Sequence, residues 1–207
     1  MEQITARDPR ADFLAVYHDT IRRDGRSSLL YWLENETDFF MAPASSKHHL
    51  AQPGGLAVHS LNVYKRLRQI AVRDIFKNGP GHLTEEQNET LAILGLLHDV
   101  CKVGVYHQET KRRKNPDTGE WEDSLGYTFR DPFPLGHGEK SLFLITCYMA
   151  LTKEEALAIR WHMGAYDDAV KGGSRSMNEA MKLTPLVWRL HEADMCAAQI
   201  DERSAAE

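Results

Sequence analysis

The sequence has 207 residues, of which 42% are hydrophobic and 27% are charged, and its formal net charge is −5. A chain of this length usually forms one domain, and this hydrophobic content can supply a core without disulfides or a structural metal. The acidic balance excludes a general basic field for nucleic acid, so any such contact needs a local patch. We therefore expect a single domain over residues 1–207.

The cysteines and the N-terminus indicate where the protein resides. Cys101, Cys147 and Cys196 are too far apart for a zinc ribbon or a redox pair, and an odd, sparse set is typical of a reducing compartment. The N-terminus lacks the apolar core of a signal peptide, and no apolar run approaches the ~18 residues that a membrane span needs. We expect a cytoplasmic protein without membrane association, whose oligomeric state the sequence does not determine.

The first part of the chain predicts two helices and a loop. Residues 9–23 have helical spacing of apolar side chains, with Asp8 as a cap and Pro9 in the first turn. A second, short helix covers about 27–36. Residues 41–55 hold small residues, two prolines and a Gly-Gly pair, which predicts a loop.

The middle of the chain predicts two long helices. The first covers about 56–77 and ends at the Asn-Gly-Pro-Gly sequence of residues 78–81. Thr84 and Gln87 form a capping box that opens the second, which runs to about residue 97. Because this second helix is apolar almost all round, we expect it to be central and buried.

The rest of the chain predicts a hairpin and further helices. Residues 104–135 have a turn signal at 115–119 between two segments of strand character, which predicts a β-hairpin or ordered loop inserted near 104–130. Helices are predicted at about 138–150, 153–163 and 184–200, the second with a capping box of Thr152 and Glu155 and the third with Pro185 in its first turn. The predicted fold class is all-α, a helical bundle with one small β insertion.

Histidines and aspartates mark the candidate chemistry, beginning with His98 and Asp99 at the end of the most apolar helix. Burying a carboxylate there is costly unless a partner such as a divalent cation neutralises it. The alternative is a helix end that emerges into water. His59 lies on the preceding helix, and Asp194 lies between apolar residues of the last one, where a solvated helix face is the alternative. The ordered set of all four is more specific than any single member.

This pattern resembles the HD-domain metal-dependent phosphohydrolase superfamily. The resemblance rests on GGLAVHSL at 54–61, LLHDVCK at 96–102 and the Ala-Asp pair at 193–194, and it spans about 45–200. It implies a helical bundle in which N-terminal helices (1–40) precede a metal-binding core (about 45–200). It also implies that His59, His98, Asp99 and Asp194 bind one metal ion.

Two further histidines resemble a second metal site. His137 and His162 lie at predicted helix boundaries between the His-Asp pair and the last aspartate. Branches of the family with two histidines in this interval commonly bind a second ion, with the aspartate of the His-Asp pair as a bridge. The alternative is one helix-capping histidine and one packed against Trp161. The sequence therefore leaves one and two divalent ions both open.

The loop before the first long helix is most similar to the HD domain of a group of bacterial 3′-to-5′ exoribonucleases. Those enzymes carry a separate OB domain, for which this chain has no room. This difference counts against processive RNA degradation, though not against phosphoester chemistry. His48 and His49 in this loop are candidates for contacting the substrate, and two exposed loop histidines are the alternative.

Lys102 is the candidate catalytic cation, alongside Asp99. It follows His98 by one helical turn, so it can face the same opening and neutralise a phosphoryl group. The alternative is a lysine that only faces the helix dipole. Mixed His and Asp ligands favour Mn, Fe, Co, Ni or Mg, whereas zinc in a closed tetrahedral site is less favoured. The basic run Lys111, Arg112 and Arg113 stands near aromatic residues and is a second substrate-binding candidate, with a solvated turn as the alternative.

Together these features predict hydrolysis of a phosphoester bond in a nucleotide or short oligonucleotide by a metal-activated hydroxide. The partner would be a small phosphorylated substrate. One alternative is a nuclease acting on longer single-stranded RNA or DNA. Another is a non-catalytic nucleotide sensor of the same fold. An oxygenase, known among HD proteins, is a more remote alternative that depends on the two-metal site.

Overall fold

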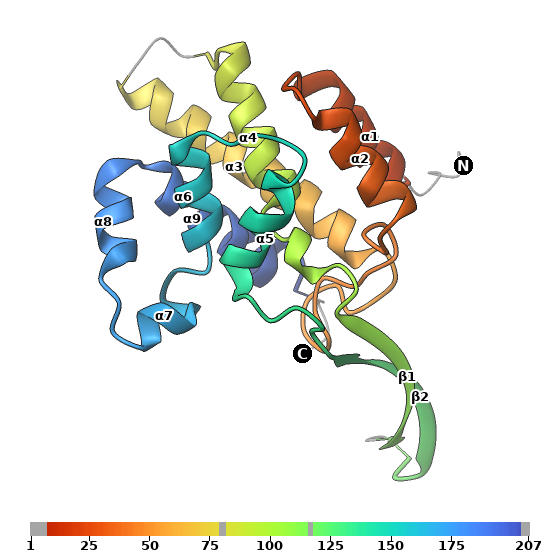
Figure 1. Ribbon diagram of the computed structural model, residues 1–207. Helices are drawn as coiled ribbons and strands as arrows, with labels where there is room; N and C mark the ends of the chain where they lie inside the picture. Colours follow the sequence, from red (N-terminus) through yellow and green to blue (C-terminus); the bar gives the residue numbers. More distant parts are fainter. Residues whose placement is uncertain (1–7, 79–81, 116–117, 204–207) are drawn as a thin grey trace.

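The computed structural model describes residues 8–78, 82–115 and 118–203. Helices make up most of its regular structure, and the one sheet in these ranges is a two-stranded hairpin (Figure 1). This confirms the predicted all-α fold class with a small β insertion. Within the same ranges, no helix combines the length and the apolar character that crossing a bilayer requires.

The α-helices of the described residues are α1 (Pro9–Thr20), α2 (Arg26–Asn35), α3 (Gly55–Asn78), α4 (Glu85–Leu97), α5 (His137–Thr146), α6 (Lys153–Trp161), α7 (Asp168–Lys171), α8 (Ser176–Leu183) and α9 (Leu186–Cys196). Shorter turns are η1 (Val100–Lys102), η2 (Gly164–Tyr166) and η3 (Ala197–Asp201), the last with π-helical hydrogen bonds. Both predicted capping boxes are present, at the starts of α4 and α6.

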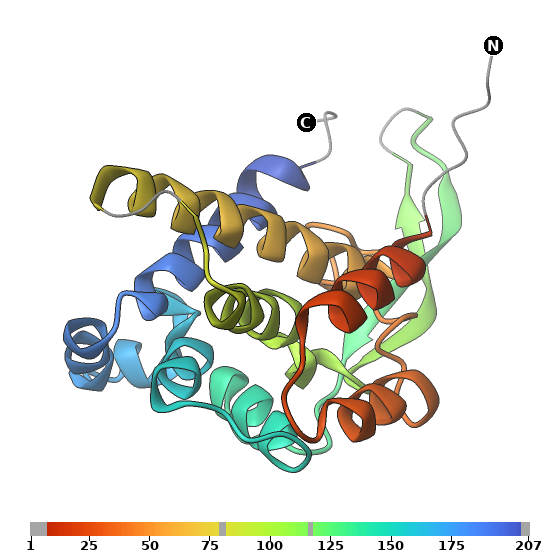
Figure 2. The same cartoon turned by 90° about the horizontal axis from the view of Figure 1, so that it is seen from above.

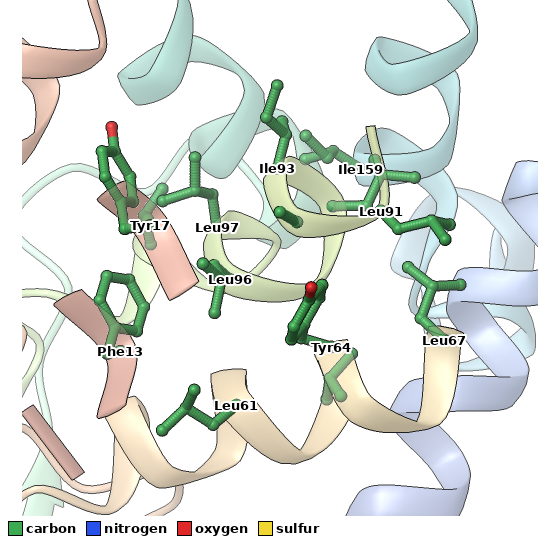
Figure 3. Close-up of a cluster of buried hydrophobic side chains, with 14 of the residues drawn as sticks. Phe13, Tyr17, Leu61, Tyr64, Leu67, Leu91, Ile93, Leu96, Leu97 and Ile159 are labelled. Carbon is green, nitrogen blue, oxygen red and sulfur yellow. The ribbon is translucent and has the colours of Figure 1, made fainter. Parts of the chain in front are cut away.

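Helix α4 lies in the middle of the bundle, packed against α1, α3 and α6 (Figure 2). Every residue of α4 from Leu91 to Leu97 is buried, as the all-round apolar sequence predicts. Leu96 and Leu97 lie among Phe13 and Tyr17 of α1 and side chains of α3 (Figure 3). The helix thus carries its C-terminal end, with His98 and Asp99, into the interior.

Glycine permits the close approach of α3 and α4. A Cβ atom on Gly95 would lie only 2.5 Å from the Cα atom of Tyr64, so no larger residue fits without moving a helix backbone. This contact sets the distance between the two helices that carry His59 and His98.

The hairpin consists of β1 (Tyr106–Lys114) and β2 (Trp121–Phe129), paired antiparallel with Tyr106 opposite Phe129. It confirms the predicted insertion near 104–130 and projects away from the helices (Figure 1). Part of the predicted turn, residues 116–117, lies outside the described residues.

Several predicted helix boundaries were wrong. The helix predicted at 9–23 ends at Thr20, because Ile21 becomes extended and the next two backbone N–H groups bind the Glu89 carboxylate instead. The helix predicted at about 138–150 ends at Thr146, four residues earlier than predicted. The helix predicted at 184–200 begins at Leu186, because Thr184 precedes Pro185 and the residue before a proline is disfavoured in helical geometry. After Cys196 the helix continues as the π-helical turn η3. Helices α7 and α8 were not predicted from the sequence.

Candidate metal centre

Six predicted ligands meet where α3, α4, α5, α6 and α9 converge. His59 lies in the second turn of α3, His98 and His162 are the C-caps of α4 and α6, His137 opens α5, and Asp194 lies within α9. The sixth candidate ligand, Asp99, follows His98. Five of the six side chains are buried, and the side chain of His137 is 31% exposed. A polar cluster this deep in an apolar bundle requires charge compensation.

One group of ligand atoms comes from α3, α4 and α9. The Nε2 atom of His59 lies 3.2 Å from Asp194 Oδ1 and 3.5 Å from Asp99 Oδ2. The ligand atoms of His59, His98 and Asp194 lie within 4.8 Å of one another, which is compatible with one bound cation. The predicted first set of four is therefore assembled in space, whereas its binding of a metal stays a prediction.

A second group lies on the other side of Asp99. Its Oδ1 atom is 2.7 Å from His137 Nε2 and 3.6 Å from His162 Nε2. Its Oδ2 atom faces His59 and His98 instead, each at 3.5 Å. The two oxygens of one carboxylate thus face two sets of imidazoles, which is the arrangement that a bridging ligand requires.

The hydrogen bonds of His98 and His162 show that these residues fit a cation. The Nδ1–H groups of His98 and His162 donate to the carbonyl oxygens of Gly95 and Ile159, at 3.1 and 2.7 Å. Their Nε2 atoms are buried and have no hydrogen-bond partner among the described residues. A buried nitrogen with an unused lone pair is costly, and the backbone bond on its far side is what metal-binding histidines usually have. The donor set therefore fits a divalent ion.

Burial and neighbouring charges favour the ligand forms of His98, Asp99 and Asp194. Burial lowers the pKa of His98 to about 3, so this imidazole is neutral. Burial alone would raise the pKa of Asp99, but the charge of Lys102 and the hydrogen bond from His137 outweigh it and hold the pKa well below its usual range. Asp194 shifts in the same direction, because His59 outweighs its burial. Neutral imidazole and ionised carboxylate are the forms that bind metal.

Lys102 lies beside the cluster, at the position predicted for a cation near the site. Its Nζ atom is 2.6 Å from Asp99 Oδ2, and its side chain is only 14% exposed. Burial lowers the pKa of Lys102, but the Asp99 carboxylate outweighs this effect and raises it, so the amine stays charged. The ammonium therefore borders the first group of ligand atoms.

Glu202 and Cys101 also contact the cluster and were not predicted from the sequence. The buried Glu202 carboxylate accepts hydrogen bonds from His59 Nδ1, at 3.0 Å, and from Asn62 Nδ2, at 3.0 Å. The thiol of Cys101 lies 3.4 Å from His137 Nδ1. Cys101 follows the His-Asp pair with one residue between them, and this proximity was the available signal. Glu202 follows no recognisable motif and is brought in by the η3 turn.

The other candidate substrate residues lie at different distances from the cluster. His49 is close, since its ring centroid is 5.0 Å from that of His59, and His48 is exposed beside it. Lys111, Arg112 and Arg113 lie on the outer half of β1. At the rise of an extended strand they are about 16–23 Å beyond Tyr106, and the structure does not bring them to the ligand cluster.

Comparisons with known proteins identify the family. A family model described as HD domain matches residues 56–199, more than half of the chain and every one of the six candidate ligands. No curated protein and no solved structure matches the chain. Members of this family are generally phosphohydrolases that depend on divalent metal ions. The chain belongs to the HD-domain family.

Proposed function

We propose that this protein hydrolyses a phosphoester bond in a nucleotide or a short oligonucleotide, with one or two divalent metal ions at the cluster around Asp99. One observation carries the proposal: the two oxygens of Asp99 face separate sets of imidazoles, two of which are buried and have unused Nε2 atoms. Structural histidines in a core normally satisfy both ring nitrogens, so a purely structural role does not account for this arrangement.

The ligand roles follow from the two groups. His59, His98, Asp99 and Asp194 would hold the first ion, and Asp99, His137 and His162 would hold the second. Mixed imidazole and carboxylate ligands favour Mn, Fe, Co, Ni or Mg over zinc in a closed site. When bound, such an ion supplies Lewis acidity and an activated water near neutral pH.

Lys102 would neutralise the phosphoryl group during the reaction. It is the cation nearest to the bridging carboxylate, and its burial strengthens its interaction with developing negative charge. His49 borders the same region and would contact the substrate. These roles require a small phosphorylated substrate, because the ligand cluster itself is buried.

We infer that the chain acts as one domain. Apolar residues of α1 and α2 pack in the same core cluster as those of α3, α4, α6 and α9, so the helices of 1–40 and the core of about 45–200 support each other. The similarity of the loop before α3 to the exoribonuclease group stays a prediction.

A nuclease acting on longer single strands is the second candidate. Arg112 and the aromatic residues Trp121 and Phe129 are exposed on the hairpin, and the register places them on one face. Basic and aromatic side chains together suit a single strand. Phe129 pairs with Tyr106 at the base of the hairpin, whereas Arg112 and Trp121 lie about 20–26 Å farther along the strands. Only a strand of several nucleotides could therefore reach both the outer residues and the cluster.

The test is a substrate series assayed on protein that has been stripped with chelator and then reloaded with Mn or another divalent ion. We expect hydrolysis of p-nitrophenyl phosphate or bis-p-nitrophenyl phosphate, of mononucleotides and of dinucleotides. A kcat/KM that rises steeply with strand length favours the nuclease. Stoichiometric nucleotide binding without turnover under any metal favours the sensor, and full activity of the metal-free protein contradicts the proposal.

A further inference from the structure

A cleft of about 440 Å³ lies beside the metal centre, between the loop at 47–52 and the turn at 198–203. Two of its lining residues also contact the cluster. Glu202 bonds to His59 Nδ1 at 3.0 Å, and the ring of His49 packs on that of His59. The cleft therefore borders the side chains that contact the candidate ligand His59.

The loop that forms one wall is held in a defined conformation. The hydroxyl of Ser45 accepts a hydrogen bond from the His48 N–H and donates one to the His49 carbonyl, both at 2.8 Å. Leu50 has a φ of 46°, a left-handed conformation that is unfavourable for a leucine. Its carbonyl accepts hydrogen bonds from two N–H groups, which hold it there. Strain of this kind persists where surrounding contacts impose it, often at ligand sites.

The lining of the cleft presents hydrogen-bond donors and positive charge. Lys47 and Arg203 carry the charges, and Gln52 and Gln199 add amide donors. Within the described parts of the chain, neither Lys47 nor Arg203 forms an ion pair. The one acid in the lining, Glu202, already binds His59 and Asn62. The free charge of the cleft is therefore positive, and it suits an anion.

We propose that this cleft binds a second phosphate group of the substrate, next to the phosphate that is hydrolysed. This inference rests on the proposed function, because it names a part of the substrate of that same site. Lys47 and Arg203 bind the second phosphate by charge-assisted hydrogen bonds. The group belongs either to a pyrophosphate chain or to the adjacent nucleotide of a strand, and these two sources share the chemistry that the cleft recognises.

The kinetic test compares Lys47→Ala and Arg203→Ala on three substrates. These are p-nitrophenyl phosphate with one phosphate, adenosine 5′-diphosphate, and 5′-phosphorylated diadenylate. We expect each variant to raise KM about 10-fold for a substrate whose second phosphate enters the cleft, with kcat little changed. The KM for p-nitrophenyl phosphate should not change. The substrate that responds identifies the source of the second phosphate.

Lys182→Ala is the matched control, since Lys182 is an exposed lysine of α8 that pairs with Glu179. It should leave all three KM values unchanged. Equal effects of Lys47→Ala on one-phosphate and two-phosphate substrates, or no effect on either, overturn the inference.

A binding experiment on chelator-treated protein tests the cleft without turnover. Side-chain NMR signals of His48 and Gln52 are followed during titration with adenosine 5′-diphosphate, 5′-phosphorylated diadenylate and adenosine 5′-monophosphate. We expect a two-phosphate ligand to bind about 10-fold more tightly to the wild type than to Lys47→Ala or Arg203→Ala. If these shifts persist although no phosphoester is hydrolysed, the cleft is supported and the proposed function fails. If hydrolysis is intact and no shift occurs, the cleft inference alone is overturned.

Discussion

Glu202 and His59 are separated by 143 residues, yet the Glu202 carboxylate accepts a hydrogen bond from His59 Nδ1 at 3.0 Å. Because the carboxylate can only accept, this bond keeps a proton on Nδ1 and leaves Nε2, which faces Asp99 and Asp194, as the nitrogen that can bind a metal ion. Glu202 lies beyond the segment 56–199 that matches the HD domain, so this support for His59 comes from outside the matched region.

The bond from His59 to Glu202 should strengthen metal binding. Glu202→Ala should weaken binding of the first metal ion about 10–100-fold, the usual effect of removing a residue that orients a histidine ligand. Glu202→Gln should lose less, because the amide oxygen can still accept from Nδ1–H. Competition titration with a chromophoric chelator measures the affinity. Asp201→Asn is the control, since Asp201 is the neighbour of Glu202 but pairs with Arg66 of α3 and not with His59. Unchanged affinity in Glu202→Ala would contradict the role.

Asp99 and His137 should differ in metal stoichiometry. Asp99→Ala should abolish turnover and reduce the binding of both ions, because its two oxygens face both groups. His137→Ala should lose the second ion and keep the first. Elemental analysis after loading, with His107→Ala on the hairpin as control, measures this. Full metal content and full activity in His137→Ala would rule out the two-metal arrangement.

Lys102 should affect catalysis without affecting metal content. Loss of a cation that stabilises developing charge costs about 2–4 kcal/mol, so Lys102→Ala should lower kcat/KM roughly 10²–10³-fold. Lys102→Arg should recover part of the loss, because it restores the charge but not the shape. Steady-state kinetics with metal quantified in parallel decide this. Wild-type kcat/KM in the alanine variant would remove Lys102 from the site.

Gly95 should be intolerant of a methyl group. Gly95→Ala places a Cβ 2.5 Å from Tyr64 Cα and must move α3 away from α4. We expect a loss of about 1–3 kcal/mol in the free energy of unfolding, although alanine favours a helix by about 1 kcal/mol over glycine. Denaturant titration measures the change. Gly172→Ala is the milder comparison, since its φ is −75° and its new Cβ would lie 3.2 Å from the Asp168 carbonyl oxygen, which a small local shift relieves. A Gly95→Ala protein as stable as wild type would contradict this packing.

Asp131 should contribute stability that disappears in acid. Its carboxylate binds the ammonium of Lys140, whose side chain is only 6% exposed, at 2.6 Å. Burial raises the pKa of Asp131, but the bonds from Lys140 and the Phe133 N–H outweigh it and lower the pKa. A lowered pKa means that the contribution is present above the unfolded-state value of about 4 and is lost as the pH falls through the folded-state value.

Asp131→Asn should therefore be less stable than wild type by about 1–3 kcal/mol near pH 7, because it leaves a buried ammonium without a charged partner. The difference should shrink below about pH 4, where the wild-type carboxylate becomes protonated. Unfolding measured at several pH values tests this. A constant difference down to about pH 2 would contradict the assignment.

Local sequence signals determined much of this protein. The capping boxes at Thr84 and Thr152 mark true helix starts, because a cap depends on residues three positions apart. The apolar surface of α4 predicted its burial, and the pair that follows it predicted a polar cluster in the core. The order of histidines and aspartates was sufficient to nominate residues that the fold brings together, because the resemblance to a family carries spatial information that spacing lacks.

Tertiary structure decided how those residues are oriented and what surrounds them. No local pattern could show that the two oxygens of Asp99 face different imidazoles, that Cys101 contacts His137, or that Glu202 supports His59. Such contacts depend on the packing of helices far apart in the chain, and on close approaches such as that at Gly95. The hairpin separates the basic residues of β1 from the cluster, because an extended strand adds about 3.3 Å per residue.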